Sequence, residues 1–391
     1  MNPPGQPLRV LHLNSLLTGG GTDDQCVKLA GQLHKLGQRV WLAGPAGRPL
    51  APVIEESGAP FFDTGAQAGR IQFILRAAGL IRREKIQIVH GHHGRDLWPT
   101  ILAARLAGTK PRIVLTRHMA KSPSSWASRH FLLGQCDALI AVSEFVAKVL
   151  REGAYEPESP EAERRVRPPI RGDHTKIHVI HGGIDTARFF PADASNKRRE
   201  LGLEPGDYAF AVVGGMDLPR GKGQREFLAA AARIHKYLPA ARFLIIGRGT
   251  MTGTLQSDIE RLGLDGKARL TGQASDMPQV MNAIDCLVHP QIGTEALGLV
   301  ICEAHACGKP VIASALDGIP EAFGAGACGR LVAQESVEEL AQAMRFQAGQ
   351  PKPSAAQAAQ LHQKIAEIFS LAIMAEKTLR LYDGLFAQSR A

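Results

Sequence analysis

Short apolar runs alternate with helix-length amphipathic stretches along almost the whole chain. The apolar runs do not alternate strictly between apolar and polar residues, so they predict strands buried on both faces of parallel sheets. A first series of runs comprises residues 9–13, 39–43, 86–90, 112–116 and 138–142, and a second comprises residues 208–213, 242–246, 268–271, 286–289 and 310–313. Two such series predict two doubly wound α/β domains.

The break between the two series falls near residues 185–193. We therefore predict a Rossmann-like first domain over residues 1–188 and a Rossmann-like second domain over residues 189–370. Residues 371–391 return to a helical pattern, and we expect this C-terminal helix to cross back to the first domain. Doubly wound sheets bind ligands beyond the carboxyl ends of their strands, so two facing domains would place a substrate pocket in the cleft between them.

Charge is divided unevenly between the two halves of the chain. Residues 1–190 hold 25 basic and 16 acidic side chains, whereas residues 191–391 hold 21 of each, so the first half carries the whole net charge of +9. An anionic partner should therefore meet the first domain. Aromatic residues make up only 5% of the 391 residues and do not interleave with a basic stripe, which disfavours a nucleic-acid-binding protein.

We expect a cytoplasmic protein. The first residues do not show the pattern of a signal peptide, and no apolar run approaches the roughly 18 residues of a membrane span. The six cysteines form no C-x-x-C pair and lie mostly within apolar segments, so reduced core thiols are expected.

A glycine-rich loop follows the first strand of each predicted domain. In the first domain, Gly19-Gly20-Gly21 precedes a helix predicted over residues 22–36, so bare backbone N–H groups and the positive end of the helix would face the cleft. The spacing is not G-x-G-x-x-G, which argues against a dinucleotide-binding loop. A simple tight turn is the alternative interpretation.

In the second domain, residues 214–223 lead into a helix predicted over residues 224–235. Arg220 and Lys222 lie just before this helix, where a diphosphate would meet both side-chain charges and N–H dipoles. The loop does not match the G-x-x-x-x-G-K-[ST] pattern of a P-loop. The alternative is a solvated basic loop.

Two carboxylates, Glu295 and Glu303, stand eight residues apart around a predicted strand-to-helix turn. If the helix begins at Leu299, Glu303 lies one turn into it and could accept hydrogen bonds from the two hydroxyls of a ribose. Glu295 would stand in the loop and face the cleft. An acid on an otherwise apolar helix face usually has a partner, because burying an unpaired charge is costly.

Histidines gather where the strands predicted over residues 86–90 and 112–116 end: His90, His92, His93 and His118. Several histidines could hold a metal ion, but no nearby carboxylate or cysteine completes a ligand set. No metal is therefore expected.

Two segments contribute to the excess positive charge of the first domain. One is a predicted amphipathic helix over residues 71–85, and the other is a Pro-, Glu- and Arg-rich segment over residues 152–174, which we expect to be a mobile loop. These segments suggest attraction to an anionic membrane surface or to a phosphorylated glycolipid acceptor; a solvated basic face is the alternative. The residues predicted to make this contact are Arg76, Arg82, Arg83, Lys85, Arg164 and Arg165.

Several motifs, taken in order, resemble those of the retaining glycosyltransferases of family four, which have the GT-B fold of two facing Rossmann-like domains. Glu295 and Glu303 resemble the family's motif of two glutamates separated by seven residues, and Gly19-Gly20 resembles its N-terminal glycine loop. Three further segments resemble family motifs: residues 142–144 a serine-bearing helix start, residues 178–191 the linker between domains, and residues 315–321 a G-G-x-P-E turn. The resemblance covers nearly the whole chain.

The resemblance implies roles for the matching residues. Glu303 would bind the ribose of a sugar nucleotide, Glu295 would contact the donor sugar or its phosphates, and Lys222 would clamp those phosphates. Backbone N–H groups of four consecutive residues would bind the diphosphate: Leu297, Gly298, Leu299 and Val300.

One position departs from the family pattern. The family usually has arginine directly after the first glycine of the second glycine-rich loop, where this chain has Gly215. Since the loop is also longer here, we expect Arg220 to supply the missing cation. His118 matches the family's active-site histidine near the reacting sugar, and we expect it to orient groups rather than act as a base.

The family activity implied is the transfer of a sugar, with retention, from a UDP- or GDP-linked donor to a lipid-linked, lipopolysaccharide or polysaccharide acceptor, without a metal or other cofactor. Such an enzyme could lie on the inner face of the cell membrane. No strong nucleophile is visible, so front-face substitution is the implied mechanism. The alternatives are a sugar-nucleotide epimerase of the same shape and a non-catalytic basic protein that binds nucleic acid.

Overall fold

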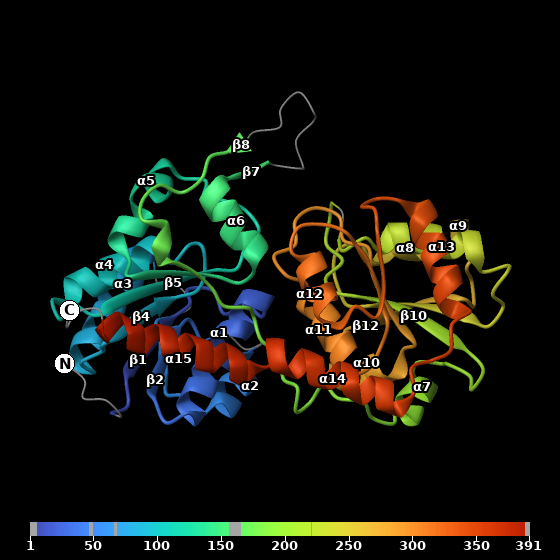
Figure 1. Cartoon of the computed structure of the whole chain (residues 1–391), viewed down its shortest axis with the longest axis horizontal. Coiled ribbons are helices and arrows are strands. Elements are labelled where there is room, and N and C mark those ends of the chain that lie inside the picture. The colour runs from blue at the N-terminus through green and yellow to red at the C-terminus, as the bar shows by residue number, and fades with distance from the viewer. Residues whose placement is uncertain (1–5, 47–49, 66–68, 156–165, 220, 388–391) are drawn as a thin grey trace. The chain divides into compact units, whose positions relative to one another are not determined.

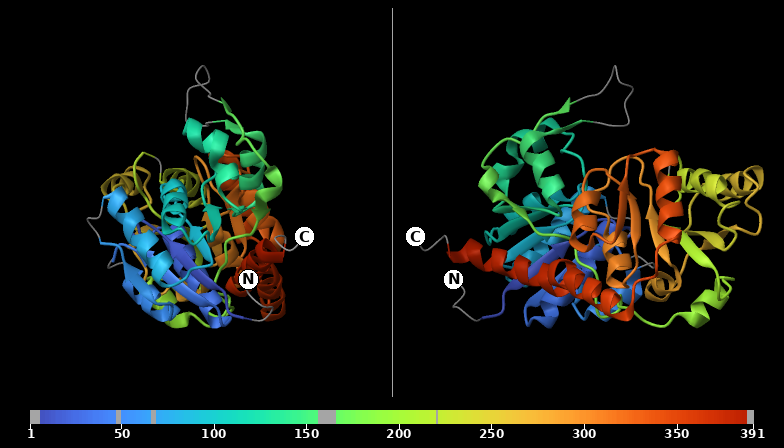
Figure 2. Two further views of the ribbon diagram at one scale, coloured as in Figure 1. Left: turned by 90° about the vertical axis from the view of Figure 1, so that its left-hand side faces the viewer. Right: turned by 45° about the vertical axis from the view of Figure 1, so that its right-hand side comes forward.

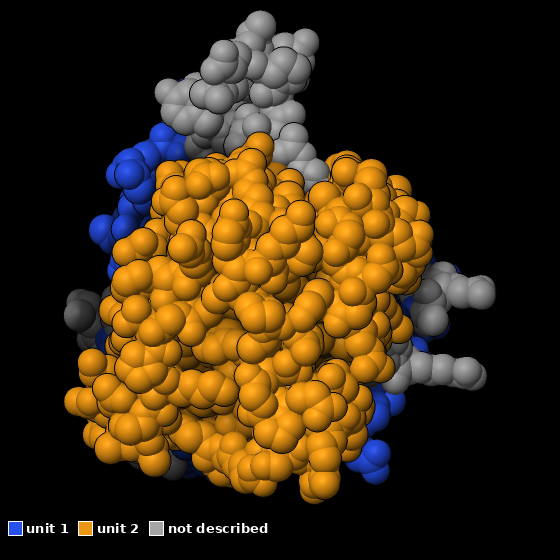
Figure 3. Space-filling view, turned by 90° about the vertical axis from the view of Figure 1, so that its right-hand side faces the viewer, with its two compact units in different colours: residues 1–183, 371–391 blue, residues 184–370 orange. Residues whose placement is uncertain are grey.

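The computed structural model describes residues 6–46, 50–65, 69–155, 166–219 and 221–387 (Figure 1). The chain forms two compact units, which we call the first unit (Met1–Gly183 and Leu371–Ala391) and the second unit (Ile184–Ser370). Figure 3 shows the surface of the second unit in orange.

The first unit is built on a sheet of seven parallel strands. In sheet order the strands are β3 (Phe61–Asp63), β2 (Arg39–Gly44), β1 (Arg9–Leu13), β4 (Ile88–Gly91), β5 (Arg112–Arg117), β6 (Ala138–Ala141) and β9 (Ile177–Val179). The order of the strands reverses between β1 and β4. In open parallel sheets this switch point, beyond the carboxyl ends of the strands, is where ligands bind.

Helices cover both faces of this sheet (Figure 1 and Figure 2). They are α1 (Gly21–Lys35), α2 (Ala51–Ser57), α3 (Arg70–Arg83), α4 (Leu97–Ala107), α5 (Trp126–Gln135), α6 (Glu144–Glu152) and the C-terminal α15 (Leu371–Ala387). A short antiparallel pair, β7 (Ala154–Tyr155) and β8 (Val166–Arg167), and a 3-10 turn, η3 (His174–Lys176), complete the described elements of this unit.

The C-terminal helix α15 belongs to the first unit although it follows the second unit in the sequence. Met374, Ala375 and Tyr382 of α15 lie in one apolar cluster with Leu29 and Leu33 of α1. Burial of this apolar face keeps the last described turns of the chain on the first sheet.

The second unit contains a sheet of six parallel strands with the same reversal of order, here between β10 and β13. In sheet order the strands are β12 (Ala268–Gly272), β11 (Ala241–Ile246), β10 (Tyr208–Val213), β13 (Cys286–His289), β14 (Val311–Ser314) and β15 (Gly329–Val332). The helices are α7 (Ser195–Glu200), α8 (Gln224–Ile234), α9 (Thr252–Arg261), α10 (Met277–Ala283), α11 (Leu299–Ala306), α12 (Ile319–Gly326), α13 (Val337–Ala348) and α14 (Ala355–Phe369).

The predicted fold class, two doubly wound parallel-sheet units, is confirmed, and each of the ten predicted strands is present within about two residues of its predicted limits. Burial on both faces explains the success, because central strands such as β6 and β14 are buried at every position. The interpretation of the apolar runs missed three strands of three or four residues, β3, β9 and β15. Each contains half-buried or exposed positions, so its apolar signal is weak.

Predicted helix starts agree closely with the structure. α8 begins at Gln224 and α11 at Leu299, as expected, and α6 begins after Ser143, whose hydroxyl accepts a hydrogen bond from the N–H of Val146. This is the serine-capped helix start that residues 142–144 indicated. Within the described residues, no helix combines the length and apolar character needed to cross a bilayer.

Candidate functional site

The loop after β10 in the second unit is held in shape from inside. The amide of Gln224, a buried side chain, donates to the backbone oxygen of Gly215 at 3.1 Å and accepts from the N–H of Lys222 at 2.7 Å. Gly223, with φ +83°, caps α8, and a Cβ there would lie 1.9 Å from the backbone oxygen of Pro290. Only glycine permits this approach to the segment after β13.

Lys222 forms an ion pair with Glu295 across the switch point of the second sheet. Its ammonium donates to Glu295 Oε2 at 2.8 Å, and the Glu295 side chain is only 18% exposed. The other oxygen of the carboxylate accepts from the N–H of Ala296 at 3.1 Å. Burial alone would raise the pKa of Glu295, but the charge and hydrogen bond of Lys222, with His289 and the bond from Ala296, bring it below its ordinary value.

The turn at residues 315–321 supports the segment that carries Glu295. The Asp317 carboxylate accepts from the N–H of Glu295 at 3.1 Å, and the N–H of Gly318 donates to the backbone oxygen of Glu295. A Cβ at Gly318 would lie 2.1 Å from the backbone oxygen of Ala296, so a glycine is required where the two segments meet. The predicted turn thus fixes the position of Glu295.

The start of α11 is open to an anion. Gly298 is the N-cap residue with φ +85° and has no side chain that could bond to the first N–H groups of the helix. Leu299 and Val300 begin the helix and are half-buried, while Leu297 is buried. Glu303 lies one turn further along α11 and is half-buried, as the sequence predicted from a helix start at Leu299.

His289 was not predicted from the sequence. It ends β13 and is buried, and neither ring nitrogen finds a hydrogen-bond partner in the described part of the chain. Burial lowers its pKa to about 4, although the charge of Glu295 opposes this. Its position at the end of a predicted strand could have identified it, because a polar residue at the carboxyl end of a buried strand beside the switch point lies on the ligand side of the sheet.

The glycine loop of the first unit differs from the prediction. Asp23 Oδ2 accepts from the backbone N–H groups of Thr18, Gly19 and Gly20, at 2.8, 3.2 and 3.4 Å, and Asp23 Oδ1 accepts from the side chain of Asn14 at 2.8 Å. The expectation that these N–H groups are bare is therefore wrong, because a buried carboxylate of the following helix already bonds to them. A role for Gly19 and Gly20 in donor binding stays a prediction.

Histidines of the first unit form a buried cluster. His90 bonds to Tyr382 and Thr116, each at 2.6 Å, while His12 and His92 bond to one another at 2.8 Å. Nitrogen atoms of His12, His90 and His92 lie within 4.8 Å of one another, so their spacing could suit a metal ion. Both ring nitrogens of His90 are hydrogen-bonded, so this ring would have to give up a bond to ligate one, whereas His12 Nε2 and His92 Nδ1 have no partner among the described residues. Burial lowers the pKa of all three rings, so we interpret the group as a cluster of neutral, partly hydrogen-bonded rings.

His118 adjoins this cluster, with its ring centroid 5.9 Å from that of His92. Burial lowers its pKa to about 4, and the charges of His93 and Arg117 act in the same direction. Its Nε2 atom is buried without a hydrogen-bond partner among the described residues. A neutral ring with one free nitrogen could orient a substrate hydroxyl.

The basic residues predicted on α3 make local contacts. Arg76 donates to the backbone oxygen of Thr64, Arg82 donates to the carbonyls of Leu106 and Ala107 at the end of α4, and Arg83 pairs with Glu84. Those bonds engage part of each guanidinium, while the side chains of Arg76, Arg82, Arg83 and Lys85 stay exposed. Arg164, Arg165 and Arg220 lie outside the described residues.

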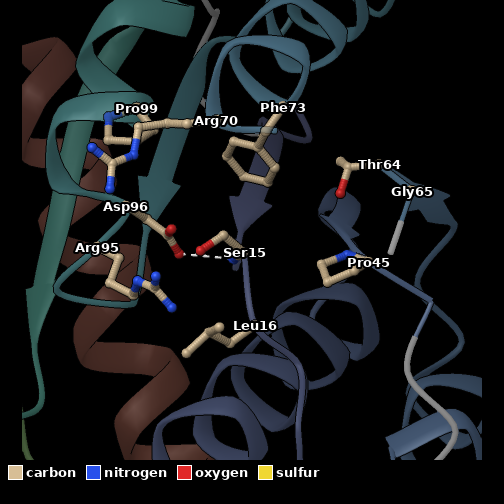
Figure 4. A pocket seen from close by; sticks show the side chains of 10 residues that line it. All are labelled: Ser15, Leu16, Pro45, Thr64, Gly65, Arg70, Phe73, Arg95, Asp96 and Pro99. Carbon is tan, nitrogen blue, oxygen red and sulfur yellow. Dashed lines mark hydrogen bonds between the residues drawn. The ribbon is translucent and has the colours of Figure 1, made fainter. Parts of the chain in front are cut away.

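The sequence interpretation also missed a cavity in the first unit (Figure 4). It has a volume of about 230 Å³, and its lining includes Ser15, Thr64, Arg70, Arg95 and Asp96. These residues follow the carboxyl ends of β1, β3 and β4. Their position at the ligand side of the sheet was the signal that could have found them.

Comparison with known proteins agrees with this architecture. A model described as "Glycosyltransferase Family 4" matches residues 19–161, and one described as "Glycosyl transferases group 1" matches residues 207–347. Among solved structures, a glycosyltransferase from Rickettsia africae superposes with a TM-score of 0.80 at 20% identity, covering 97% of this chain and 99% of that one. Anabaena HepE, solved in complex with UDP and glucose, superposes with a TM-score of 0.78 at 19% identity, covering 96% and 100%.

The two doubly wound units and the site after β10 and β13 therefore define a protein of the GT-B class. Within that class, the chain belongs to glycosyltransferase family 4. Similar curated proteins include the D-inositol 3-phosphate glycosyltransferase of Mycobacterium marinum, 29% identical over 70% of this chain and 59% of the relative. The corresponding protein of Rhodococcus erythropolis is 27% identical over 93% of this chain and 86% of the relative. The match thus spans about three fifths of the length of several such relatives.

Proposed function

We propose that the protein is a glycosyltransferase that transfers a sugar from a nucleotide-sugar donor to an acceptor hydroxyl. The observation that carries this proposal is the pairing of Lys222 with Glu295 beside the uncapped start of α11. An ammonium and free helix N–H groups at one switch point suit a diphosphate. Family membership and the UDP and glucose named with Anabaena HepE support the same donor class.

The residues of the second unit divide the work of donor binding. Lys222, together with Arg220, holds the diphosphate, and the backbone N–H groups of Leu297 to Val300 bind its oxygens. Glu303 accepts hydrogen bonds from the ribose hydroxyls, since it lies one turn beyond those N–H groups on the same helix. Glu295 stays charged because its pKa is low, and it contacts the donor sugar.

Transfer proceeds with retention at the reacting carbon and without a metal ion. The bond between the sugar carbon and the diphosphate oxygen breaks, and the acceptor oxygen forms its bond on the same face of the sugar. The acceptor proton passes to an oxygen of the departing phosphate. Glu295 is a poor nucleophile because Lys222 holds its carboxylate, so a covalent intermediate is disfavoured. Lys222 and the helix N–H groups stabilise the charge that develops on the leaving group.

His118 orients the reacting groups. Its pKa of about 4 keeps the ring neutral near pH 7, so it can form hydrogen bonds but adds no charge. We expect His118→Ala to lower kcat by roughly a hundredfold while the donor dissociation constant changes little. A loss of donor affinity with unchanged kcat would contradict this role.

Nucleotide release tests the function directly. UDP-, GDP- and ADP-linked sugars are incubated with and without acceptors, and we expect release that depends on both donor and acceptor. The matching nucleoside diphosphate, at a hundred times its dissociation constant, should stabilise the protein by about 2.7 kcal/mol in a thermal-shift assay. Lys222→Ala should reduce this stabilisation, whereas Lys236→Ala, at an exposed lysine on the same unit, should keep it in full. Conversion of the donor into a nucleotide sugar of altered configuration, without transfer to any acceptor, would favour the epimerase alternative.

We propose a lipid-linked, lipopolysaccharide or polysaccharide acceptor, met at the cytoplasmic face of the membrane. Ile71 and Leu75 of α3 and Leu102 and Leu106 of α4 are exposed, with Ile71 at 73%, and these two helices pack side by side. Ile71 and Leu75 are four residues apart, as are Leu102 and Leu106, so each pair lies on one side of its helix and forms a short apolar stripe. Exposed apolar side chains beside arginines are typical of surfaces that rest on anionic lipid.

Vesicle pelleting tests this surface. The protein should sediment with vesicles rich in phosphatidylglycerol and stay in the supernatant with phosphatidylcholine vesicles, since each basic residue contributes about 1 kcal/mol near anionic lipid. The double change Leu75→Ser and Leu106→Ser should abolish sedimentation. Leu36→Ser, at an exposed leucine directly after α1, is the matched control. Equal recovery from both kinds of vesicle would remove the proposal.

A further inference from the structure

The cavity after β1, β3 and β4 of the first unit carries charges that the proposed donor site does not use. Its volume of about 230 Å³ adjoins a second cavity of about 630 Å³, and the two share Arg70, Arg95 and Pro99 in their linings. Together they reach the size of small-molecule sites in proteins. All lining residues belong to the first unit.

Two guanidinium groups border the cavity without partners of their own. Arg70 begins α3 and Arg95 follows β4, and within the described residues neither side chain forms an ion pair or a side-chain hydrogen bond. This differs from Arg76 and Arg82, whose guanidinium groups bond to backbone carbonyls. Arg70 and Arg95 are therefore available to an anion, and guanidinium groups match the geometry of phosphate oxygens.

The start of α3 adds to this positive region. Its N-cap residue is Gly69, which provides no side-chain cap, and its first turn contains no acidic residue. The N–H groups of the first turn and the positive end of the helix dipole therefore act in the same sense as Arg70.

Asp96 provides the second, independent observation. It is fully buried, and its Oδ2 atom accepts from the N–H of Ser15 at 2.9 Å, while no hydrogen bond to Oδ1 is present in the part of the chain that the structure describes. In the view of Figure 4 its carboxylate lies between the guanidinium groups of Arg70 and Arg95, with Ser15 beside it. Although it precedes α4 as the N-cap residue, it does not cap that helix.

A buried carboxylate oxygen without a donor is costly, so a bound hydroxyl group would stabilise it. Burial raises the pKa of Asp96, and the hydrogen bonds of Ser15 and the charge of His93 only partly oppose this. The site thus combines two cations with one acceptor for a hydroxyl.

We propose that this cavity recognises a phosphorylated polyol: Arg70 and Arg95 bind the phosphate, and Asp96 accepts a hydrogen bond from a hydroxyl of the same molecule. The inference rests on the proposed function, because such a molecule would serve as the acceptor. A free sugar or cyclitol phosphate and a phosphorylated lipid head group share this chemistry. The name of the curated relatives, which are D-inositol 3-phosphate glycosyltransferases, suggests the first probe.

Calorimetric titration of the full chain tests the inference with three probes: D-inositol 3-phosphate, inositol and inorganic phosphate. Each titration is run with and without saturating nucleoside diphosphate. The phosphorylated polyol should bind at least tenfold more tightly than either inositol or inorganic phosphate, because it alone satisfies both parts of the site. Equal binding of inositol and its phosphate, or binding of none of the three, would overturn the inference.

Variants separate the two parts of the site. Arg70→Gln and Arg95→Gln should each weaken D-inositol 3-phosphate by roughly tenfold to a hundredfold and weaken inorganic phosphate as well. Asp96→Asn should weaken the polyol phosphate but leave inorganic phosphate unchanged or bound more tightly, since it removes a negative charge. Arg39→Gln, at an exposed arginine that starts β2 and so lies at the opposite edge of the sheet, is the matched control.

The two arginines are exposed, so their replacement should leave the core and the melting temperature unchanged. If Arg70→Gln and Arg95→Gln bind the polyol phosphate as well as the wild type does, the inference fails. Vesicles that contain phosphatidylinositol phosphate distinguish the source of the phosphate. If soluble D-inositol 3-phosphate competes with binding of the protein to these vesicles, the same site recognises a lipid head group.

The outcomes for function and for acceptor class are separable. Turnover of a nucleotide sugar without any phosphate-dependent binding in the first unit would overturn the acceptor inference and leave the proposed function in place. Binding that depends on Arg70 and Asp96 without turnover of any nucleotide sugar would support the phosphate site and count against the proposed function.

Discussion

The two glycine-rich loops occupy the same place in their respective sheets but have opposite electrostatic character. Each follows the first strand of its unit and leads into a helix at the switch point. In the first unit, the carboxylate of Asp23 accepts from the N–H groups of the loop. In the second unit, a neutral amide, Gln224, holds the loop, and Lys222 presents an ammonium to Glu295.

This difference shows that a glycine-rich loop before a helix is not by itself an anion-binding site. A carboxylate three residues into the helix satisfies the N–H groups and adds a negative charge, so the first loop repels phosphate more than it attracts it. The second loop is held by a neutral amide, so no carboxylate bonded to its own N–H groups opposes a phosphate, and its cation pairs with Glu295 from the segment after β13. We therefore assign the diphosphate to the second unit.

The strongest test removes both cations of the second loop. We expect Lys222→Ala and Arg220→Ala each to weaken binding of the donor nucleotide and the double variant to abolish measurable binding, a loss of about 3 to 6 kcal/mol if each charge-assisted bond contributes about 1.5 to 3 kcal/mol. Calorimetric titration of the nucleoside diphosphate measures both.

Arg220 decides how the missing family arginine at Gly215 is replaced. An unchanged donor dissociation constant in Arg220→Ala would end the idea that Arg220 takes that role. Lys236→Ala controls for the general loss of positive charge from the second unit, because this lysine is exposed and lies beyond the end of α8.

The next test concerns the stability of the first loop. Asp23→Ala leaves three N–H groups and the buried Asn14 amide without their acceptor, so the free energy of unfolding should fall by roughly 2 to 4 kcal/mol. Urea unfolding followed by tryptophan fluorescence measures this in the first unit alone, because Trp41, Trp98 and Trp126 all lie there.

A neighbouring carboxylate provides the control for Asp23. Asp24 pairs with Lys28 on the surface of α1 at 2.7 Å, and Asp24→Ala should cost less than about 1 kcal/mol. If Asp23→Ala were as stable as Asp24→Ala and bound nucleoside diphosphate more tightly than the wild type, Asp23 would block an anion site rather than build the loop.

Most of the fold could be predicted from local sequence pattern, because buried strands appear as short apolar runs and helices as amphipathic stretches. The start of α11 at Leu299, and with it the place of Glu303, could be predicted in this way. The contacts that a side chain makes with distant segments of the chain could not be predicted in this way. Arg82 looks like a surface charge in the sequence, yet it bonds to the last carbonyls of α4.

The candidate site shows the same limit. Lys222 and Glu295 are 73 residues apart in the chain, and only resemblance to a family suggested that they belong to one site. The cavity of the first unit was missed because Ser15, Arg70 and Asp96 come from segments that follow three different strands. Only the strand order of the sheet brings such segments together.

The smallest expected effect is the pH dependence of the Lys222–Glu295 pair. The pKa of Glu295 in the folded protein lies below its ordinary value of 4.5, so the pair stabilises the fold fully above that value and loses this contribution as pH falls through the folded pKa. Glu295→Gln keeps the shape but removes the charge, and should be about 1 kcal/mol less stable than the wild type at pH 7. Calorimetric melting should show this difference shrinking below about pH 4. Glu260→Gln, at an exposed glutamate on α9, is the control and should show no such trend. If the stability difference between Glu295→Gln and the wild type instead grew toward acid pH, Lys222 would not hold Glu295 in its charged form.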